Sequence, residues 1–319
     1  VQAQAMKVGA VMAAITYLTQ VLQGVMMMSM MFQTLAKASA SANRLREVLE
    51  TDPVIKSGSV SLSDKTGGTV SFKNVSFSYP ETKGRPVISD LTLDIKSGES
   101  VAILGATGSG KSSLVNLIPR FYDCTAGEVL VDGVNVKDYT FAALYDKLGY
   151  VTQKAVLFSG TVRENVFFGE SAQPFDDADL GSAIEISQAK EFVDNKEGRL
   201  DFEIEQGGKN LSGGQRQRLT IARAVVKKPE ILILDDSASA LDFATDAALR
   251  KAIREMEGET TVFIVSQRAA SIQHADRIVV LDDGKIVGLG TSEELLESCE
   301  VYQEIYNSQF KKQEGGKTA

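Results

Sequence analysis

Residues 101–112 read VAILGATGSGKS, a short apolar run that leads directly into a glycine-rich loop. The segment Gly105–Ser112 fits the pattern G-x-x-x-x-G-K-S, and the stretch 112–121 after it, SSLVNLIPRF, is compatible with a helix. Glycines let such a loop curl until its N–H groups point at phosphate oxygens, and the helix N-terminus adds a positive dipole end. A plain glycine turn is the alternative, but this context favours a phosphate-binding loop.

The residue types in this loop indicate separate roles. Lys111 supplies a point charge for the β- and γ-phosphates of ATP, and the Ser112 hydroxyl is a ligand for Mg²⁺. The residues expected to hold the nucleotide here are Gly105, Thr107, Gly108, Ser109, Gly110, Lys111, Ser112 and Ser113.

Two aspartates come directly after another apolar run, ILIL at 231–234. Open α/β sheets place ligand chemistry at the carboxyl ends of their parallel strands. Asp235 is therefore the expected Mg²⁺ partner, as in other nucleotide hydrolases with a phosphate loop. Asp236 stands where a base for the attacking water is needed, and the alternative for it is an acidic cap on the next helix.

Composition excludes several classes of protein. The 319 residues are 43% hydrophobic and 24% charged, which fits about two globular units and rules out a disordered chain. A net charge of −8 argues against a nucleic-acid binder. Cys124 and Cys299 lie far apart and indicate neither a zinc site nor a disulfide framework, which fits a reducing, cytosolic setting. His274 is the single histidine, so a histidine metal cluster is excluded.

The N-terminal segment has a different character. No charged residue occurs between Lys7 and Lys37, and this apolar run is long enough to cross a bilayer as a helix. It is too long for a signal peptide, and the basic residues after it predict that the rest of the chain is cytoplasmic. Its glutamines and threonines suit a helix that faces other helices, although a buried core helix of a soluble protein is the alternative. The chain opens with Val1, which suggests a fragment of a longer polypeptide.

The pattern along the chain predicts four segments. The predicted membrane helix and its extension occupy 1–52, a polar linker 53–68, a nucleotide-binding domain 69–310 and a mobile tail 311–319. Short apolar strands alternate with helices in the domain, with a mostly helical stretch over 138–228, and this indicates an α/β fold with a parallel sheet.

A second glycine motif points to a family. Leu211–Gln215 reads LSGGQ, lies 23 residues before Asp235 when counted from Ser212, and leads into an amphipathic helix. Together with the phosphate loop, it resembles the signature motif of the ATP-binding cassette (ABC) family. The resemblance covers essentially all of 69–310 and implies a P-loop fold with a mixed sheet and a helical subdomain. The N-terminal part is similar to the last membrane helix of ABC exporters.

The resemblance implies further site residues. Tyr79 looks like the aromatic that stacks on adenine, and Gln153 like the Q-loop residue that reaches Mg²⁺ and the γ-phosphate. Residues 239–242, from Ser239 to Asp242, read SALD and look like the D-loop. In this family two nucleotides lie between two cassettes, so the signature residues Ser212, Gly213, Gly214 and Gln215 are expected to act on the nucleotide held by another chain.

The sequence departs from the family at catalytic positions. Asp236 stands where the family has glutamate, and Gln267, in the context VSQR, where it has the switch histidine. The shorter carboxylate should reach its water less well, and glutamine cannot carry a proton charge. His274 lies too far along the chain to replace it. Gln206 stands where many exporters carry a glutamate that contacts the membrane domain.

These departures favour one half of a heterodimeric exporter in the cell membrane, multi-pass at full length and with its nucleotide domain in the cytoplasm. Its own site would bind Mg²⁺–ATP and turn over slowly. Its intact LSGGQ would serve a different partner half that carries the glutamate and histidine. The transported molecule is expected to be a small molecule, drug or lipid. The alternatives are a homodimer in which Asp236 works, a regulatory nucleotide-binding module and a soluble ATPase.

Overall fold

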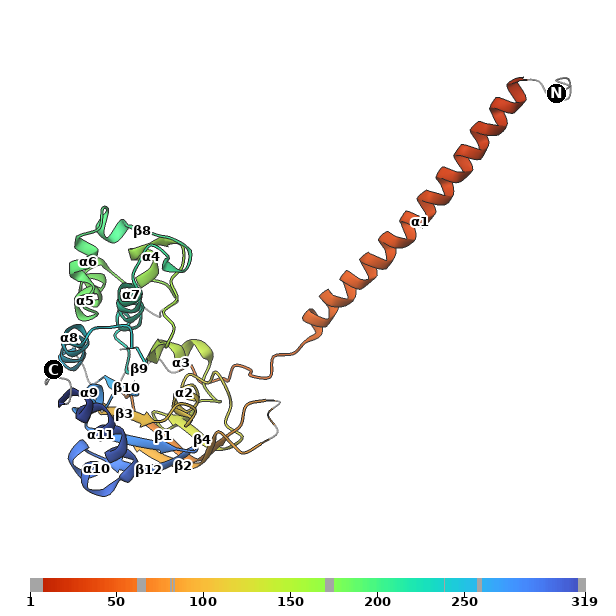
Figure 1. The fold of residues 1–319 in the computed structure, drawn as a ribbon. Coiled ribbons are helices and arrows are strands. Elements are labelled where there is room, and N and C mark those ends of the chain that lie inside the picture. The colour runs from red at the N-terminus through yellow and green to blue at the C-terminus, as the bar shows by residue number, and fades with distance from the viewer. Residues whose placement is uncertain are drawn as a thin grey trace. The chain divides into compact units, whose positions relative to one another are not determined.

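The computed structural model describes residues 8–61, 67–80, 82, 84–169, 175–237, 239–256 and 260–314 (Figure 1). The chain divides after Lys56 into two compact units. The first contains the long helix α1 (Val8–Glu50), and the second contains the described strands and the remaining helices.

Helix α1 leaves its apolar side chains uncovered. None of its residues is buried, and large side chains such as Leu22 and Phe32 are 63% and 68% exposed. The hydroxyls of Thr16, Thr19 and Thr34 each donate to a carbonyl one turn earlier, so these polar groups are satisfied within the helix. The helix is long and apolar enough to cross a membrane. Within the first unit, no described residue covers it.

The second unit contains two larger sheets. One is antiparallel in the order β2-β1-β4-β5, and the other has the order β12-β11-β3-β10-β9-β6 and is parallel except at β12. The strands are β1 (Val70–Phe77), β2 (Ile88–Ile95), β3 (Ser100–Gly105), β4 (Ala126–Val131), β5 (Val134–Asn135), β6 (Leu148–Val151), β9 (Ile231–Asp235), β10 (Thr261–Val265), β11 (Arg277–Asp282) and β12 (Lys285–Gly290), with a separate pair β7 (Gly160–Thr161) and β8 (Glu203–Ile204).

Helices gather around these sheets. Figure 1 shows α4 to α7 grouped at one end of the unit and α10 and α11 at the other. Their bounds are α2 (Lys111–Val115), α3 (Phe141–Lys147), α4 (Val162–Val166), α5 (Asp177–Ile186), α6 (Lys190–Asp194), α7 (Gly213–Val225), α8 (Phe243–Arg254), α9 (Ala269–Ile272), α10 (Ser292–Ser298) and α11 (Glu300–Glu314), with short 3₁₀ turns at Arg199–Asp201 and Gln206–Gly208.

The observed architecture confirms the predicted α/β fold, with a mixed sheet and a helical subdomain, after a long helix. The expected helical stretch 138–228 also contains β6, β7 and β8, which the sequence pattern misses. Strand β6 is only four residues long, and a side chain at Gly149 within it would collide with the Ala224 carbonyl. Tertiary packing, rather than local periodicity, thus selects the strand.

The predicted linker 53–68 crosses the division between the units. Within the second unit, the N–H groups of Gly58 and Val60 donate to the carbonyls of Tyr139 and Asp138, at 2.9 and 2.8 Å. The start of this unit is therefore fixed by hydrogen bonds before the predicted domain begins. At the other end α11 runs to Glu314, and residues 315–319 of the predicted tail lie outside the described residues.

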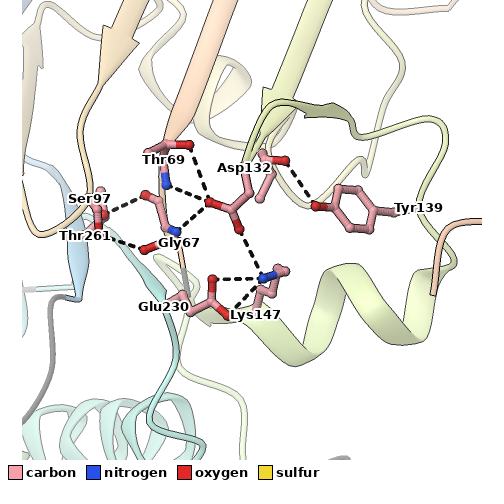
Figure 2. Close-up of polar contacts among 10 residues, drawn as sticks. Gly67, Thr69, Ser97, Asp132, Tyr139, Lys147, Glu230 and Thr261 are labelled. Atoms are coloured by element: carbon pink, nitrogen blue, oxygen red, sulfur yellow. Dashed lines mark hydrogen bonds and ion pairs between the residues drawn. The ribbon is translucent and has the colours of Figure 1, made fainter. Parts of the chain in front are cut away.

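A buried ionic cluster joins the two larger sheets (Figure 2). The Lys147 ammonium lies 3.0 Å from Asp132 Oδ2 and donates to both carboxylate oxygens of Glu230 at 2.9 Å. Asp132 Oδ1 in turn accepts the N–H groups of Gly68 and Thr69, at 2.6 and 2.9 Å. Burial disfavours the charges, but these partners still raise the pKa of Lys147 and lower that of Asp132. Both groups therefore stay ionised.

This cluster lies at the amino ends of the parallel strands. Lys147 and Glu230 directly precede β6 and β9, and Asp132 comes directly after β4 of the other sheet. The carboxyl ends of the same strands are therefore left clear of it.

We predict that Lys147→Met destabilises the protein by about 3–5 kcal/mol, because it leaves two buried carboxylates without their cation. Urea unfolding measures this loss. Lys190→Met is the matched control: its pair with Glu185 is exposed on both sides, so a change below about 1 kcal/mol is expected. A Lys147→Met protein as stable as the parent would contradict the assigned role.

Candidate nucleotide site

A cavity of about 400 Å³ opens at the carboxyl ends of the parallel strands. Strand β10 pairs with both neighbours in register, so that Val265 lies opposite Ile103 of β3 and Asp235 of β9. Segments far apart in the sequence therefore meet at the carboxyl ends of these three strands. The lining residues are Tyr79, Val87, Thr107, Gly108, Gly110, Lys111, Ser112, Ser113, Gln153, Asp235, Asp236, Val265, Ser266 and Gln267.

The phosphate loop takes the curled backbone that its glycines allow. Gly108 and Gly110 have φ of +87° and +100°, which side-chain-bearing residues rarely adopt. A side chain at Gly110 would also approach the Val87 carbonyl to 2.9 Å. Ser109 is buried within the loop, and Gly105 ends strand β3. Helix α2 then starts at Lys111, as the motif predicts.

Lys111 is 7% exposed. Its ammonium donates to the carbonyls of Gly105 and Ala106, at 2.9 and 2.8 Å. Burial lowers the pKa of Lys111, and the carboxylates of Asp236 and Asp235 oppose that shift. A buried cation held by neutral carbonyls is suited to an incoming phosphate anion.

The Mg²⁺ side of the cavity is built from oxygen donors. The Ser112 hydroxyl donates to Asp235 Oδ1 at 2.9 Å, and the Tyr150 hydroxyl approaches Asp235 Oδ2 at 3.5 Å. Burial raises the pKa of Asp235, whereas the bond from Ser112 opposes the shift. Tyr150, which sequence reasoning missed, makes its shorter hydrogen bond to Asn116 Oδ1, to which it donates at 2.8 Å. No recognisable sequence motif marks it.

These residues fit ATP and Mg²⁺, the cofactors expected of such a domain. Mg²⁺ is commonly held by one or two protein oxygens together with water and substrate phosphates. Within the described residues, no group of three or more His, Cys, Asp or Glu side chains forms a full protein cage. Ser112 and Asp235 supply hard oxygen ligands, and Lys111 supplies the charge that phosphates require.

Asp236 is held in the wall of the same cavity as Lys111. Its backbone is left-handed, with φ of +46°, and its N–H donates to the Val265 carbonyl at 2.9 Å. Its Oδ2 accepts the amide of Gln153 at 3.2 Å. The alternative that Asp236 caps the next helix is wrong, because the side chain of Asp242 caps α8 through the Thr245 N–H. Asp236 thus faces the cavity.

The switch position is occupied by Gln267, directly after Ser266 at the end of β10. His274 instead lines a separate cavity beside α8, which agrees with its exclusion from the switch. Tyr79 lies at the site with its hydroxyl 2.9 Å from Ser113 Oγ and its ring edge-on to Phe77 and Tyr122. Adenine stacking by Tyr79 stays a prediction.

The LSGGQ segment lies elsewhere. The Ser212 hydroxyl accepts the Gln215 N–H at 3.2 Å, and the Gln215 side chain accepts the Ser212 N–H at 3.0 Å, which forms a capping box at the start of α7. Ser212 and Gly213 are exposed. Of the lining residues that the structure describes, none comes from 211–215. The chain therefore does not bring this motif to its own phosphate loop.

Comparison with known proteins gives consistent matches. The sequence model described as ABC transporter matches residues 88–239. An uncharacterised ABC transporter ATP-binding protein of Mycobacterium bovis is 41% identical over 307 residues, which cover 95% of this chain and 52% of the relative. A putative multidrug export ATP-binding/permease protein of Staphylococcus aureus is 40% identical, with 76% and 41% covered.

A solved structure is also similar. A bacterial Atm1-family ABC exporter with ATP bound matches with a TM-score of 0.80 and 30% identity, over 92% of this chain and 51% of that one. The chain thus spans about half the length of the relatives it matches.

We predict that Lys111→Met lowers the affinity for Mg²⁺–ATP at least about tenfold, or 1.4 kcal/mol, because the phosphates lose their buried cation. Isothermal titration measures the affinity. The melting temperature without nucleotide should hardly change, since Met fills the same space without a buried charge. Lys251→Met, at an exposed position on α8, should leave the affinity as it is. Equal affinities in the two variants would contradict the assignment.

Proposed function

Since the second unit of this chain is a nucleotide-binding domain of the ABC transporter family, we propose that the chain is the C-terminal part of one half of an ATP-driven membrane exporter. We further propose that its own ATP site hydrolyses slowly and that its LSGGQ completes the active site of a different half. Exporter relatives about twice as long support the first part.

The pair Asp236 and Gln267 carries the second part. Both line the cavity that holds Lys111, Ser112 and Asp235, so the binding half of the site is complete while its two catalytic positions are altered. The Asp236 carboxylate is engaged by Gln153 and has one methylene less than glutamate to reach a water. The Gln267 amide can donate a hydrogen bond to a phosphate oxygen but cannot carry a proton charge near neutral pH.

The residues that line the cavity have separate roles toward Mg²⁺, the phosphates and the attacking water. Bound Mg²⁺ would supply positive charge to the phosphates, with Ser112 and Asp235 as its protein ligands. Lys111 would exchange its bonds to the Gly105 and Ala106 carbonyls for phosphate oxygens. Proton removal from a water falls to Asp236, and this is the step that we expect to be slow.

The exposed signature supports a two-chain site. Ser212 and Gly213 lie at the N-terminus of α7, where the helix dipole favours an anion. They are exposed and do not line this chain's cavity, so a nucleotide on another chain is the anion that they would contact. A different partner half, with glutamate and histidine at the two altered positions, would then perform most of the turnover.

Helix α1 supports a membrane location. Its uncovered apolar side chains need lipid or other helices, and its hydroxyls are already satisfied within the helix. We propose that it is the last membrane helix of a multi-pass protein in the cell membrane and that the nucleotide-binding domain is cytoplasmic. The transported molecule would be a small molecule, drug or lipid.

The proposal predicts an asymmetry in the two-half transporter. Ser212→Ala in this chain should lower ATP turnover in membranes about tenfold or more, because it disables the partner's site, whereas Asp236→Ala should change it less than about twofold. Thr291→Ala controls for the lost helix cap, since Thr291 and Glu294 form the same capping box on α10. Equal losses from Ser212→Ala and Asp236→Ala, or the reverse order, would favour a homodimer in which Asp236 is the working base.

A gain of function tests the altered positions directly. Asp236→Glu combined with Gln267→His should raise turnover at this chain's site by about 10-fold or more, because a longer base and a titratable switch are restored. Phosphate release from the chain, with the partner's signature serine in place, measures this. Lack of any gain, with unchanged Mg²⁺–ATP affinity, would count against slow catalysis at Asp236 and Gln267.

A further inference from the structure

The last helix reaches the switch segment. Gln309 of α11 contacts the backbone on both sides of Arg268: its Nε2 donates to the Gln267 carbonyl at 2.6 Å, and its Oε1 accepts the Ala269 N–H at 2.8 Å. A primary amide offers one donor and one acceptor side by side, so a single side chain satisfies both backbone groups.

The backbone at this point lacks a local partner. Ala269 is the first residue of α9, and Arg268 at the N-cap makes no side-chain capping bond. The orphan N–H of a helix start is therefore satisfied from a residue 40 positions later in the chain. The Gln309 side chain therefore holds both the Gln267 peptide and the start of α9. Gln267 is also one of the residues that line the nucleotide cavity.

Helix α11 is itself fixed by packing against the rest of the second unit. Tyr302 is fully buried and its hydroxyl lies 2.7 Å from Ser292 Oγ. Ile305 and Tyr306 pack against the cluster that contains Tyr302 and Ile272 of α9. Positions 302, 305, 306 and 309 lie on one face of a helix, so packing of the first three aims Gln309 at the switch segment.

The switch segment also contacts the D-loop. Arg268 Nη2 donates to the Ser239 carbonyl at 3.3 Å, and the guanidinium lies 5.6 Å from the centre of the Phe243 ring. The segment between Gln267 and Ala269 is thus held from α11 on one side and from the D-loop on the other.

We propose that Gln309 is a positioning residue for the nucleotide site: it fixes the Gln267 backbone so that the Gln267 amide is presented to the γ-phosphate. The C-terminal helix is thereby part of the machinery that distinguishes ATP from ADP, although it contributes no residue to the cavity wall that the structure describes. This inference rests on the role proposed above for Gln267.

Nucleotide discrimination separates positioning from mere stability. Only ATP has a γ-phosphate, so loosening the switch should weaken ATP and leave ADP as it is. Gln309→Leu removes both hydrogen bonds, and Gln309→Glu keeps the acceptor for Ala269 while placing an oxygen against the Gln267 carbonyl. We expect both variants to lower Mg²⁺–ATP affinity about five- to tenfold with unchanged Mg²⁺–ADP affinity, measured by isothermal titration of the chain in detergent.

Two controls make the result decisive. Gln303→Leu, on the same helix, removes only a local bond to the Leu296 carbonyl and should keep the ratio of the two affinities. Gln267→Ala should reduce the ratio as Gln309→Leu does. Suppose that Gln267→Ala reduces the ratio of ATP affinity to ADP affinity, while both Gln309 variants keep a normal ratio or lose the two affinities equally. This result overturns the role of Gln309 and leaves the role of Gln267 standing. A normal ratio in Gln267→Ala overturns the role of Gln267, and this inference falls with it.

Discussion

Parallel pairing of β3, β10 and β9 in register is the constraint on which the site depends. It brings the phosphate loop, Asp235 and the switch segment to one edge of a sheet although they are far apart in the sequence. The ionic cluster around Lys147 stabilises the opposite edge, where the two sheets meet. The carboxyl ends can therefore hold features that cost stability, such as a buried lysine and a left-handed aspartate, because the amino ends secure the fold.

Local sequence signals predict the parts of the fold and site that depend on local chemistry. The phosphate loop is recognisable because glycines with positive φ and a lysine at the helix start are consequences of the motif itself. Strand β6 is missed because its four residues carry no period, and the packing of Gly149 selects it. Tyr150 and Gln309 are missed because their partners, Asp235 and Gln267, are distant in sequence and only the folded chain brings them together.

In the proposed function, the site combines an intact binding half with a weakened catalytic half. The Ser112 hydroxyl is already hydrogen-bonded to Asp235 at 2.9 Å, and Lys111 is held by two loop carbonyls, so the ligands for phosphates and Mg²⁺ lie in place before the nucleotide binds. Asp236 and Gln267 depend on neighbours for their orientation, namely Gln153 and Gln309.

The most direct test of slow hydrolysis at an intact binding site is ATP turnover by the chain alone, measured together with its affinity for Mg²⁺–ATP. The account predicts tight binding with near-zero turnover, because the cavity retains its phosphate and Mg²⁺ ligands while Asp236 and Gln267 replace the family's glutamate and histidine. Brisk turnover by the chain alone would contradict it. Asp236 would then be an effective base, and two identical chains would suffice for function.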